Sequence, residues 1–266
     1  MKKVCIDIGH VPGANRSPCV PEYSEGSRMV DLGNALAATL TECFDDVEVF
    51  FTRPDVNLDL GVVQRGNAAA GADLFVSLHS NASNNEHCDD INYPLVIYPY
   101  DGVNNSTSIA AIFGQALDTV YKLHNVDALR TRITSKEGLR GDYYGVMRGA
   151  RNVGVPLYFI IEHGFHTNAE NAVALLKDEF MTDIVIAEAG VIASTLGLSK
   201  REYVPGDVDG DGNVDLTDYA MLKRYILGTL ELSAAQLRRA DINGDGKVDL
   251  LDLATLKRRI MKEAKR

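Results

Sequence analysis

Four residues with acid–base or metal-binding side chains stand beside the ends of ordered segments. His10 follows VCIDIG, His79 follows DLFVSL and Glu162 follows LYFII, and all three segments are apolar. Glu25 lies in EYSEGSRM, just before a segment with helical spacing. Two histidines and a carboxylate are a common ligand set for catalytic zinc, with water in the open position. A second carboxylate near that water can act as a general base.

Each of these residues also has a simpler interpretation. A histidine at the end of a strand is commonly a hydrogen-bonded loop residue, and a glutamate before a helix is commonly a cap favoured by the helix dipole. Glu162 is harder to explain in this way, because an unpaired carboxylate after an apolar strand is costly to bury. Burial should also raise the pKa of Glu162 toward neutrality, which suits a general base. Spacing alone leaves both interpretations open.

Strand-like and helical segments alternate up to about residue 199, and this pattern would bring the four residues together. The predicted strands are VCIDI, VEVFFTR, DLFVSLH, PLVIYPY, GVMR and LYFIIE. The predicted helices are residues 27–44, LGVVQRGNAAAGA, SIAAIFGQALDTVYKL, ENAVALLKDEF and DIVIAEAGVIASTLG. The alternation predicts an α/β sheet with helices on both faces. Ligands of such sheets bind beyond the carboxyl ends of the strands, where these side chains stand.

Composition excludes several classes of protein. The chain has 266 residues, which predicts roughly two domains. Its net charge of −10 and the lack of a long Lys/Arg block argue against nucleic acid as a partner. No apolar run of about 18 residues occurs, so no membrane span is expected. The start, MKKVCIDIGH, has no apolar signal segment, which leaves an intracellular protein or one whose signal peptide has been removed.

Five ordered segments resemble the zinc-dependent N-acetylmuramoyl-L-alanine amidases of the family 3 type. They are IDIGH, Glu25 with its helix, TRPD, QRGNAAAGADLFVSLHSNA and IIEHGFHTNAEN. The resemblance implies a mixed, mostly parallel sheet flanked by helices, with one Zn²⁺ held by His10, Glu25 and His79. It also implies Glu162 as the catalytic residue. The implied reaction is hydrolysis, by zinc-activated water, of the amide bond between N-acetylmuramic acid and L-alanine in peptidoglycan.

The sequence departs from the family pattern close to these residues. After His10 the loop reads VPGANRSPCVPEY where the family usually has a Gly-rich stretch. His163 and His166 stand where a small and an apolar residue are usual, and they are expected to be substrate contacts or solvated loop residues. A structural salt bridge is the alternative for Arg65. The candidates for substrate contact or for orienting the zinc ligands are Asp7, Arg65, Asn81, His163 and His166.

The C-terminal part of the chain contains a duplicated segment. DVDGDGNVDLTDYAMLKRYILG and DINGDGKVDLLDLATLKRRIMK stand 34 residues apart and agree at 13 of 22 positions. Each begins with the spacing of a calcium loop, with side-chain ligands at positions 1, 3, 5 and 12, a backbone carbonyl at position 7 and a glycine at the sharp turn. The predicted ligands are Asp207, Asp209, Asp211, Asn213 and Asp218, then Asp241, Asn243, Asp245, Lys247 and Asp252.

This duplicated pair resembles a type I dockerin, the small all-α module that attaches an enzyme to cohesin domains of a scaffoldin. The resemblance implies two Ca²⁺ ions and a cohesin partner. Cohesin would contact loop positions 10 and 11 and the basic residues beyond them, which are Leu216, Thr217, Lys223, Arg224, Leu250, Leu251, Lys257 and Arg258. The predicted domains are an amidase over 1–199, a short linker over 200–205 and a dockerin over 206–266.

The dockerin resemblance also bears on the compartment. Cohesin partners are extracellular, so we expect an extracellular, scaffold-associated protein whose signal peptide has been removed. Disulfides are then possible. Cys19 and Cys88 lie in loops that follow the strands ending in His10 and His79. Because those loops should be neighbours on one rim, a Cys19–Cys88 disulfide is expected.

Two other functions fit the same residues. One is a catalytically inactive module that only binds cell wall on a scaffold, although the presence of all four key residues argues against it. The other is a zinc peptidase that acts on peptide bonds. Products released from purified peptidoglycan distinguish the three, because only an amidase creates free muramyl lactyl ends together with new L-alanine amines.

Overall fold

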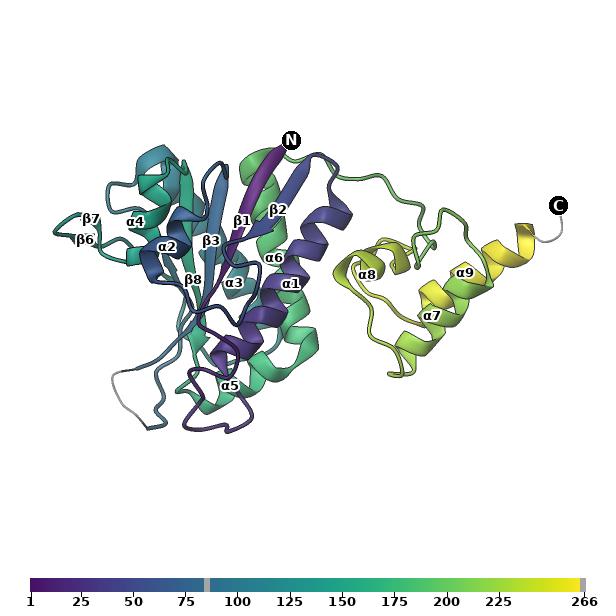
Figure 1. Ribbon diagram of the computed structural model, residues 1–266. Coiled ribbons are helices and arrows are strands. Elements are labelled where there is room, and N and C mark those ends of the chain that lie inside the picture. The colour runs from purple at the N-terminus through teal and green to yellow at the C-terminus, as the bar shows by residue number, and fades with distance from the viewer. Residues whose placement is uncertain (84–86, 264–266) are drawn as a thin grey trace. The chain divides into compact units, whose positions relative to one another are not determined.

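The structure is a computed structural model that describes residues 1–83 and 87–263. The chain divides into two compact units, Met1–Ser199 and Lys200–Arg266. The first unit contains a sheet with helices, and the second contains helices and loops (Figure 1).

The first unit is built on a six-stranded sheet in the order β2-β1-β3-β8-β4-β5. The strands are β1 (Lys2–Ile8), β2 (Val47–Phe51), β3 (Leu74–Asn81), β4 (Leu95–Ile97), β5 (Arg132–Thr134) and β8 (Leu157–Phe165). Strands β2, β1, β3 and β8 run parallel, β4 is antiparallel to β8, and β5 is parallel to β4. This mixed, mostly parallel sheet confirms the predicted fold class.

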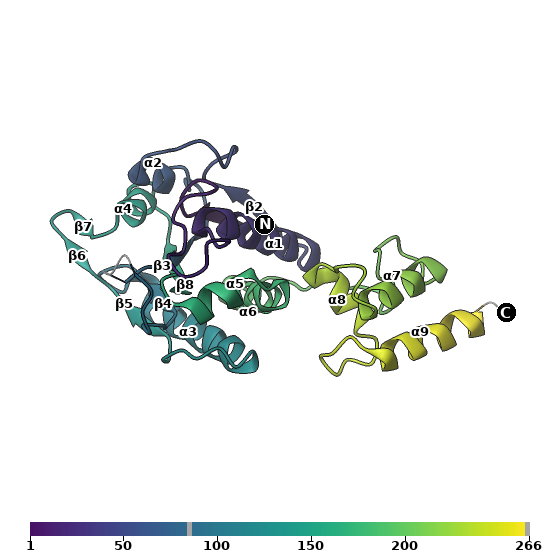
Figure 2. The same cartoon turned by 90° about the horizontal axis from the view of Figure 1, so that it is seen from below.

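Helices cover both faces of the sheet (Figure 2). One face carries α1 (Glu25–Cys43), α3 (Ser106–Leu123), α5 (Ala169–Leu176) and α6 (Asp178–Leu196), and the other carries α2 (Val62–Asn67) and α4 (Gly145–Asn152). A single 3-10 turn, η1 (Val103–Asn105), leads into α3. The alternation of strand side chains sends Cys5, Phe75 and Tyr158 toward α2 and α4, where they are buried.

The predicted strand GVMR is wrong, because these residues form the first turn of α4. Val146 and Met147 are buried, and Ala150 is buried one turn later on the same side of the helix. So short an apolar run does not distinguish a strand from a buried helix. A hairpin of β6 (Glu137–Gly138) and β7 (Gly141–Asp142) precedes α4 and was not predicted, since its residues are mostly polar or glycine.

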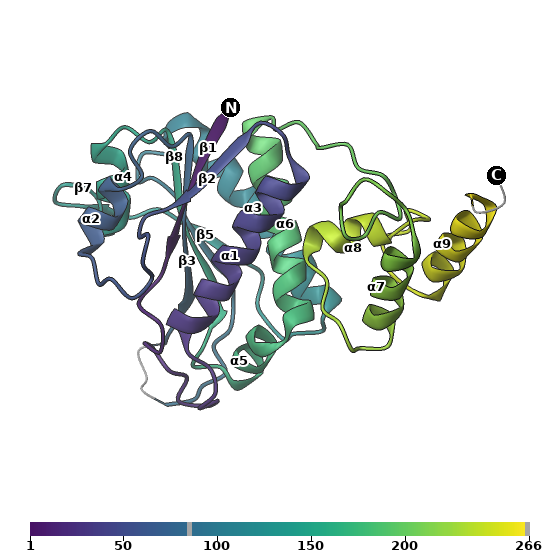
Figure 3. The same ribbon diagram turned by 45° about the vertical axis from the view of Figure 1, so that its right-hand side comes forward.

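The second unit contains α7 (Leu216–Ile226), α8 (Ala234–Ala240) and α9 (Leu250–Glu263) (Figure 3). Helices α7 and α9 each follow one of the duplicated loops, and α8, which was not predicted, leads into the second loop. A small core joins these elements, formed by Val208, Leu222, Leu232, Ala240 and Leu256. In neither unit is a described helix both long enough and apolar enough to cross a membrane.

Candidate active site

The pairing of β3 with β8 places His79 directly beside Glu162. Both side chains lie on the sheet face that α2 and α4 cover further along, two residues beyond the paired Ser77 and Ile160. Gly9 extends β1 next to them, and its N–H donates to the carbonyl of Leu78 at 2.9 Å. A Cβ atom at Gly9 would lie 2.5 Å from the His79 ring, so glycine leaves the space that the imidazole occupies.

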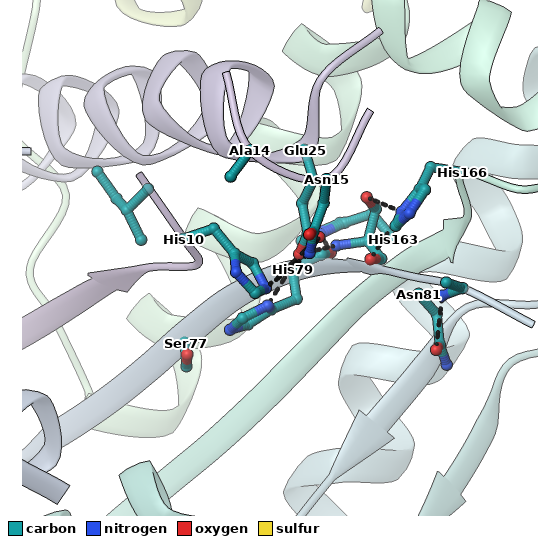
Figure 4. A network of polar contacts seen from close by, with 12 residues as sticks. His10, Ala14, Asn15, Glu25, Ser77, His79, Asn81, His163 and His166 are labelled. Carbon is teal, nitrogen blue, oxygen red and sulfur yellow. Dashed lines mark hydrogen bonds and ion pairs between the residues drawn. The ribbon is translucent and has the colours of Figure 1, made fainter. Parts of the chain in front are cut away.

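His10 and Glu25 reach the same place from the loop between β1 and α1. His10 has a φ of 59°, in the left-handed region, where the chain turns away from the strand. Glu25 opens α1 directly after Ser24, whose side chain caps the helix. Glu25 Oε1 lies 2.9 Å from His79 Nδ1, and Glu25 Oε2 lies 3.6 Å from His10 Nε2 (Figure 4).

These three side chains form a group of donors that fits a zinc ion. One ligand atom from each of His10, Glu25 and His79 lies within 4.8 Å of the others. Burial would raise the pKa of Glu25, but the hydrogen bond and charge of His79, with His10 and Asn15, lower it to about 2. The carboxylate therefore stays ionised between two imidazoles. Two imidazole nitrogens and one carboxylate are donors that zinc prefers.

The two histidines differ in their electrostatics. Burial lowers the pKa of His10, although the negative charge of Glu25 opposes this. Burial acts in the same direction on His79, but the hydrogen bond and charge of Glu25 outweigh it and raise its pKa. Glu25 is therefore the residue that couples the two rings.

Glu162 has a carboxylate oxygen without a partner. Its Oε2 atom is buried and accepts no hydrogen bond from any residue of 1–83 and 87–263. Burial raises the pKa of Glu162 to about 7. The charge of His79 lowers this pKa, and the negative charge of Glu25 raises it. Leaving a buried acceptor unpaired costs about 1–3 kcal/mol. The unpaired Oε2 atom of Glu162, beside His79, is therefore available to a water molecule or a substrate.

Asp7 and Arg65 form a buried pair beneath the site. Asp7 is fully buried and accepts hydrogen bonds from Thr52 at 2.6 Å, Ser77 at 2.6 Å and Arg65 Nε at 2.9 Å. Arg65 also donates to the carbonyl of Ile8 at 3.1 Å. Burial alone would raise the pKa of Asp7, but Arg65 and the two hydroxyl groups lower it. The pair joins β1, β3 and α2, so Arg65 forms the structural salt bridge considered for it.

Two residues of the site were not among the predicted ones. Arg53 donates to the carbonyls of His10 at 2.6 Å and Ile8 at 2.7 Å, and so fixes the start of the ligand loop, by which we mean the loop between β1 and α1. Asn15 Nδ2 lies 2.8 Å from Glu25 Oε2 and 3.0 Å from His10 Nε2. The TRPD segment contained a signal for Arg53. No local pattern indicated Asn15, because its contacts with Glu25 and His10 depend on how the loop folds back.

The remaining predicted residues lie beside the site rather than in it. His163 is fully buried on the opposite face of β8, where its Nε2 lies 2.8 Å from Glu188 Oε1. His166 is also buried, with Nδ1 3.0 Å from Ser80 Oγ. The expectation that these histidines are solvated is therefore wrong. The Asn81 carbonyl accepts from the His166 N–H at 2.8 Å, so Asn81 positions the strand end.

The expected Cys19–Cys88 disulfide is present and is confirmed. It ties the loop between β1 and α1 to the loop that follows β3. These two loops carry or adjoin all three members of the triad, His10, Glu25 and His79.

In the second unit the duplicated loops have matching hydrogen bonds. The residue at position 1 of each loop accepts from two glycine N–H groups, at 2.9 and 3.0 Å for Asp207 and at 2.8 and 2.9 Å for Asp241. The carboxylates of Asp207, Asp209 and Asp211 lie within 4.8 Å of one another, and this cluster fits calcium. In the second loop Asn243 stands at the position of Asp209.

Comparison with known families decides what the first unit is. Residues 4–194 match the N-acetylmuramoyl-L-alanine amidase family. The chain belongs to this family. Residues 205–261 match the dockerin type I domain, so the amidase carries a dockerin at its C-terminal end.

Relatives of the amidase unit are bacterial and viral. The chain is 30% identical to an endolysin of Bacillus phage SPP1 over 203 residues, which are 75% of this chain and 68% of the endolysin. It is 26% identical to the N-acetylmuramoyl-L-alanine amidase CwlM of Bacillus licheniformis, over 76% of this chain and 71% of CwlM.

Solved structures share the fold of the amidase unit. The catalytic domain of CwlV, an amidase from Bacillus (Paenibacillus) polymyxa var. colistinus, superposes with a TM-score of 0.60 at 21% identity, covering 75% of this chain and 100% of that one. An amidase from Clostridium difficile 630 gives 0.59 at 20% identity, covering 74% and 97%. The protein is thus an N-acetylmuramoyl-L-alanine amidase with a His/Glu/His metal site and a dockerin.

Proposed function

We propose that Glu162 is the general base of this amidase and that His10, Glu25 and His79 hold one Zn²⁺. The substrate is the amide bond between N-acetylmuramic acid and L-alanine in peptidoglycan. The observation that carries the assignment is the buried, unpartnered Oε2 of Glu162 beside His79, next to three convergent metal donors.

The proposed chemistry divides between the metal and the protein. Zinc, when bound, would polarise the amide carbonyl and lower the pKa of a water molecule to about 7. Glu162 Oε2 is free to accept a proton from water, since it has no other donor among the described residues. With its pKa near 7, Glu162 can also return that proton to the departing L-alanine amine at neutral pH.

The residues around the triad hold it in place. Asn15 donates to Glu25, and Arg53 holds the backbone of His10. Asp7 and Arg65 fix the strands from which the site extends. Such supporting contacts commonly change metal affinity or activity by roughly 10- to 100-fold when they are removed.

We further propose that the dockerin binds two Ca²⁺ ions and docks the enzyme on a cohesin domain of an extracellular scaffoldin. All eight residues predicted to contact cohesin are exposed. Among them Leu216, Leu250 and Leu251 are 71%, 67% and 62% exposed, and apolar side chains at these positions of both loops support a docking surface. The Cys19–Cys88 disulfide supports an oxidising compartment. We assign 1–199 to the amidase, 200–205 to the linker and 206–266 to the dockerin.

The test is product analysis on purified peptidoglycan with the wild-type protein and Glu162→Gln. Free muramyl lactyl ends with new L-alanine amines, absent with the variant, are expected. New amines at other residues of the peptide would instead identify a peptidase. Binding to cell wall without any release of products would identify an inactive binding module.

A further inference from the structure

A hollow of about 820 Å³ lies outside the catalytic residues, between the β6–β7 hairpin and helices α2 and α4. The hairpin projects from the sheet domain on the side of these helices (Figures 1 and 2). Lys136, Arg140 and Arg148 line the hollow together with Tyr143, and Glu137 is the single acidic residue among its lining residues. The hollow is therefore basic, although the chain as a whole carries a charge of −10.

Two of the basic side chains of the hollow are not paired with a carboxylate of the described residues. Lys136 Nζ lies 3.7 Å from the centre of the Tyr143 ring. Neither Lys136 nor Arg140 forms an ion pair with a carboxylate in the described part of the chain. Arg151, nearby on α4, differs because it pairs with Asp101 at 2.8 Å and Asp142 at 2.9 Å. Lys136 and Arg140 are thus free to bind an anion.

The hairpin that carries these residues is held in place at its base. Arg148 Nη1 donates to the carbonyl of Asp142 at 3.0 Å and to that of Tyr143 at 2.5 Å. The Asp142 side chain accepts from the N–H of Tyr100 at 2.7 Å and from the hydroxyl of Tyr158 at 2.9 Å. A ligand would therefore meet an ordered wall, which reduces the entropy lost on binding.

Tyr143, which lines the hollow, and its neighbour Tyr144 connect the hollow to the strand that carries Glu162. Tyr144 stands next to Tyr143, and their ring centres are 5.1 Å apart. Tyr144 packs against the buried core cluster that contains Ile160, which lies two residues before Glu162 on the same face of β8. A stem peptide whose scissile amide lies at Glu162 would extend past these two tyrosines to reach the hollow.

We propose that Lys136 and Arg140 bind a free carboxylate of the stem peptide, beyond the L-alanine whose amide is cleaved. This inference rests on the proposed function, which supplies the substrate. Stem peptides of peptidoglycan are peptides with free carboxylates, and lysine and arginine form strong charge-assisted hydrogen bonds with such groups. The hollow would thus select substrates by the charge of the stem.

The test compares two soluble substrates, an N-acetylmuramoyl tetrapeptide with free carboxylates and the same molecule with those carboxylates converted to amides. The wild-type holoenzyme should have a lower KM for the free acid. In the double variant Lys136→Ala/Arg140→Ala, KM for the free acid should rise about tenfold, the effect of losing a charge-assisted hydrogen bond. The kcat value and the KM for the amidated substrate should be unchanged.

Lys122→Ala is the matched control, because it removes an exposed positive charge from α3 on the other face of the sheet. Zinc content and melting temperature verify that each variant is folded. Equal changes of KM for both substrates, or no change for either, would overturn the inference while leaving the amidase assignment intact. If the wild-type protein cleaves neither substrate, the proposed function fails and this inference fails with it.

Discussion

The two metal-binding regions of this protein are built in opposite ways. The amidase site takes His10 from the loop after β1, Glu25 from the start of α1, and His79 and Glu162 from the paired strands β3 and β8, so only the fold brings them together. Each proposed calcium loop of the dockerin has its expected ligands within 12 consecutive residues. The first site is therefore a product of the fold, whereas in the second region we expect the fold to depend on the site.

The cores of the two units show the same difference. The sheet of the amidase unit has strands with fully buried side chains on both faces, such as Val4 and Cys5. In the described part of the dockerin the core cluster contains five buried apolar residues, and the first loop brings three carboxylates within 4.8 Å of one another. Small domains bury little apolar surface, so we expect metal binding to supply much of the folding free energy of the dockerin.

The largest effect should follow from changing Glu162. Glu162→Ala should retain zinc and lose roughly 10² to 10⁴-fold in rate, the usual contribution of a general base. Activity on peptidoglycan and metal content, measured on the same sample, check this. His79→Ala is the counterpart and should lose zinc first. Loss of zinc from the Glu162 variant would show that this residue is a ligand.

Chelation should separate the two units. With EGTA the dockerin should unfold and lose cohesin binding, because uncompensated carboxylates in each loop repel one another. The amidase should stay folded, and it should be active once Zn²⁺ is restored. Calorimetry should show two transitions with calcium. Without calcium the dockerin transition should be lost or strongly shifted to lower temperature.

The double variant Asp211→Ala/Asp245→Ala should reproduce the effect of EGTA without any chelator. A chelated protein that still binds cohesin would contradict the coupling of calcium to folding. An amidase that unfolds together with the dockerin, or that stays inactive after Zn²⁺ is restored, would contradict the independence of the two units.

Predictability from sequence follows the same division. The duplicated loops could be predicted from the sequence alone, since the order and spacing of their expected ligands lie within twelve-residue segments. The strands themselves were also predictable, because β1, β3 and β8 are continuous apolar runs, but their ends were not: β8 was expected to end at Glu162 and continues to Phe165, and β3 continues past His79 to Asn81. Spacing could not predict toward which face of the sheet each side chain points. His163 directly follows Glu162, yet its side chain lies on the other face and contacts Glu188. Asn15 likewise depends on the path of a loop.

A third prediction concerns the buried pair beneath the active site. Arg65→Ala should lower the free energy of unfolding of the amidase unit by about 3–5 kcal/mol, because it leaves the Asp7 carboxylate buried without its cation. Denaturant titration checks this. Arg16, an exposed arginine in the ligand loop, gives a control, and Arg16→Ala should change stability little. An equally small effect at Arg65 would show that the pair is not required for stability.

The same pair predicts how stability depends on pH. The folded protein lowers the pKa of Asp7 below its ordinary value of 3.8. The contribution of Asp7 is therefore complete above pH 3.8 and is lost as the pH falls toward the lower pKa of the folded state. Unfolding titrations between pH 7 and 2 should show this loss in the wild-type protein. Asp7→Asn should show a weaker dependence on pH in that range.

The smallest effect should come from the Cys19–Cys88 disulfide. It closes a loop with a sequence separation of 69 residues, but it joins two surface loops, and Cys88 itself is exposed. Cys19→Ser/Cys88→Ser should therefore reduce stability by about 2 kcal/mol, at the low end of the usual range. For a unit of this size that is roughly 4–8 °C in melting temperature.

Zinc affinity should fall as well, because the bond holds the loop of His10 and Glu25 against the strand that carries His79. Reducing agent should give the same shifts in the wild-type protein and none in the variant, since the free cysteines Cys5 and Cys43 are buried. The dockerin transition should not move in either case. If reduction shifts the dockerin transition, or leaves zinc affinity unchanged, the disulfide does not act on the metal site as argued.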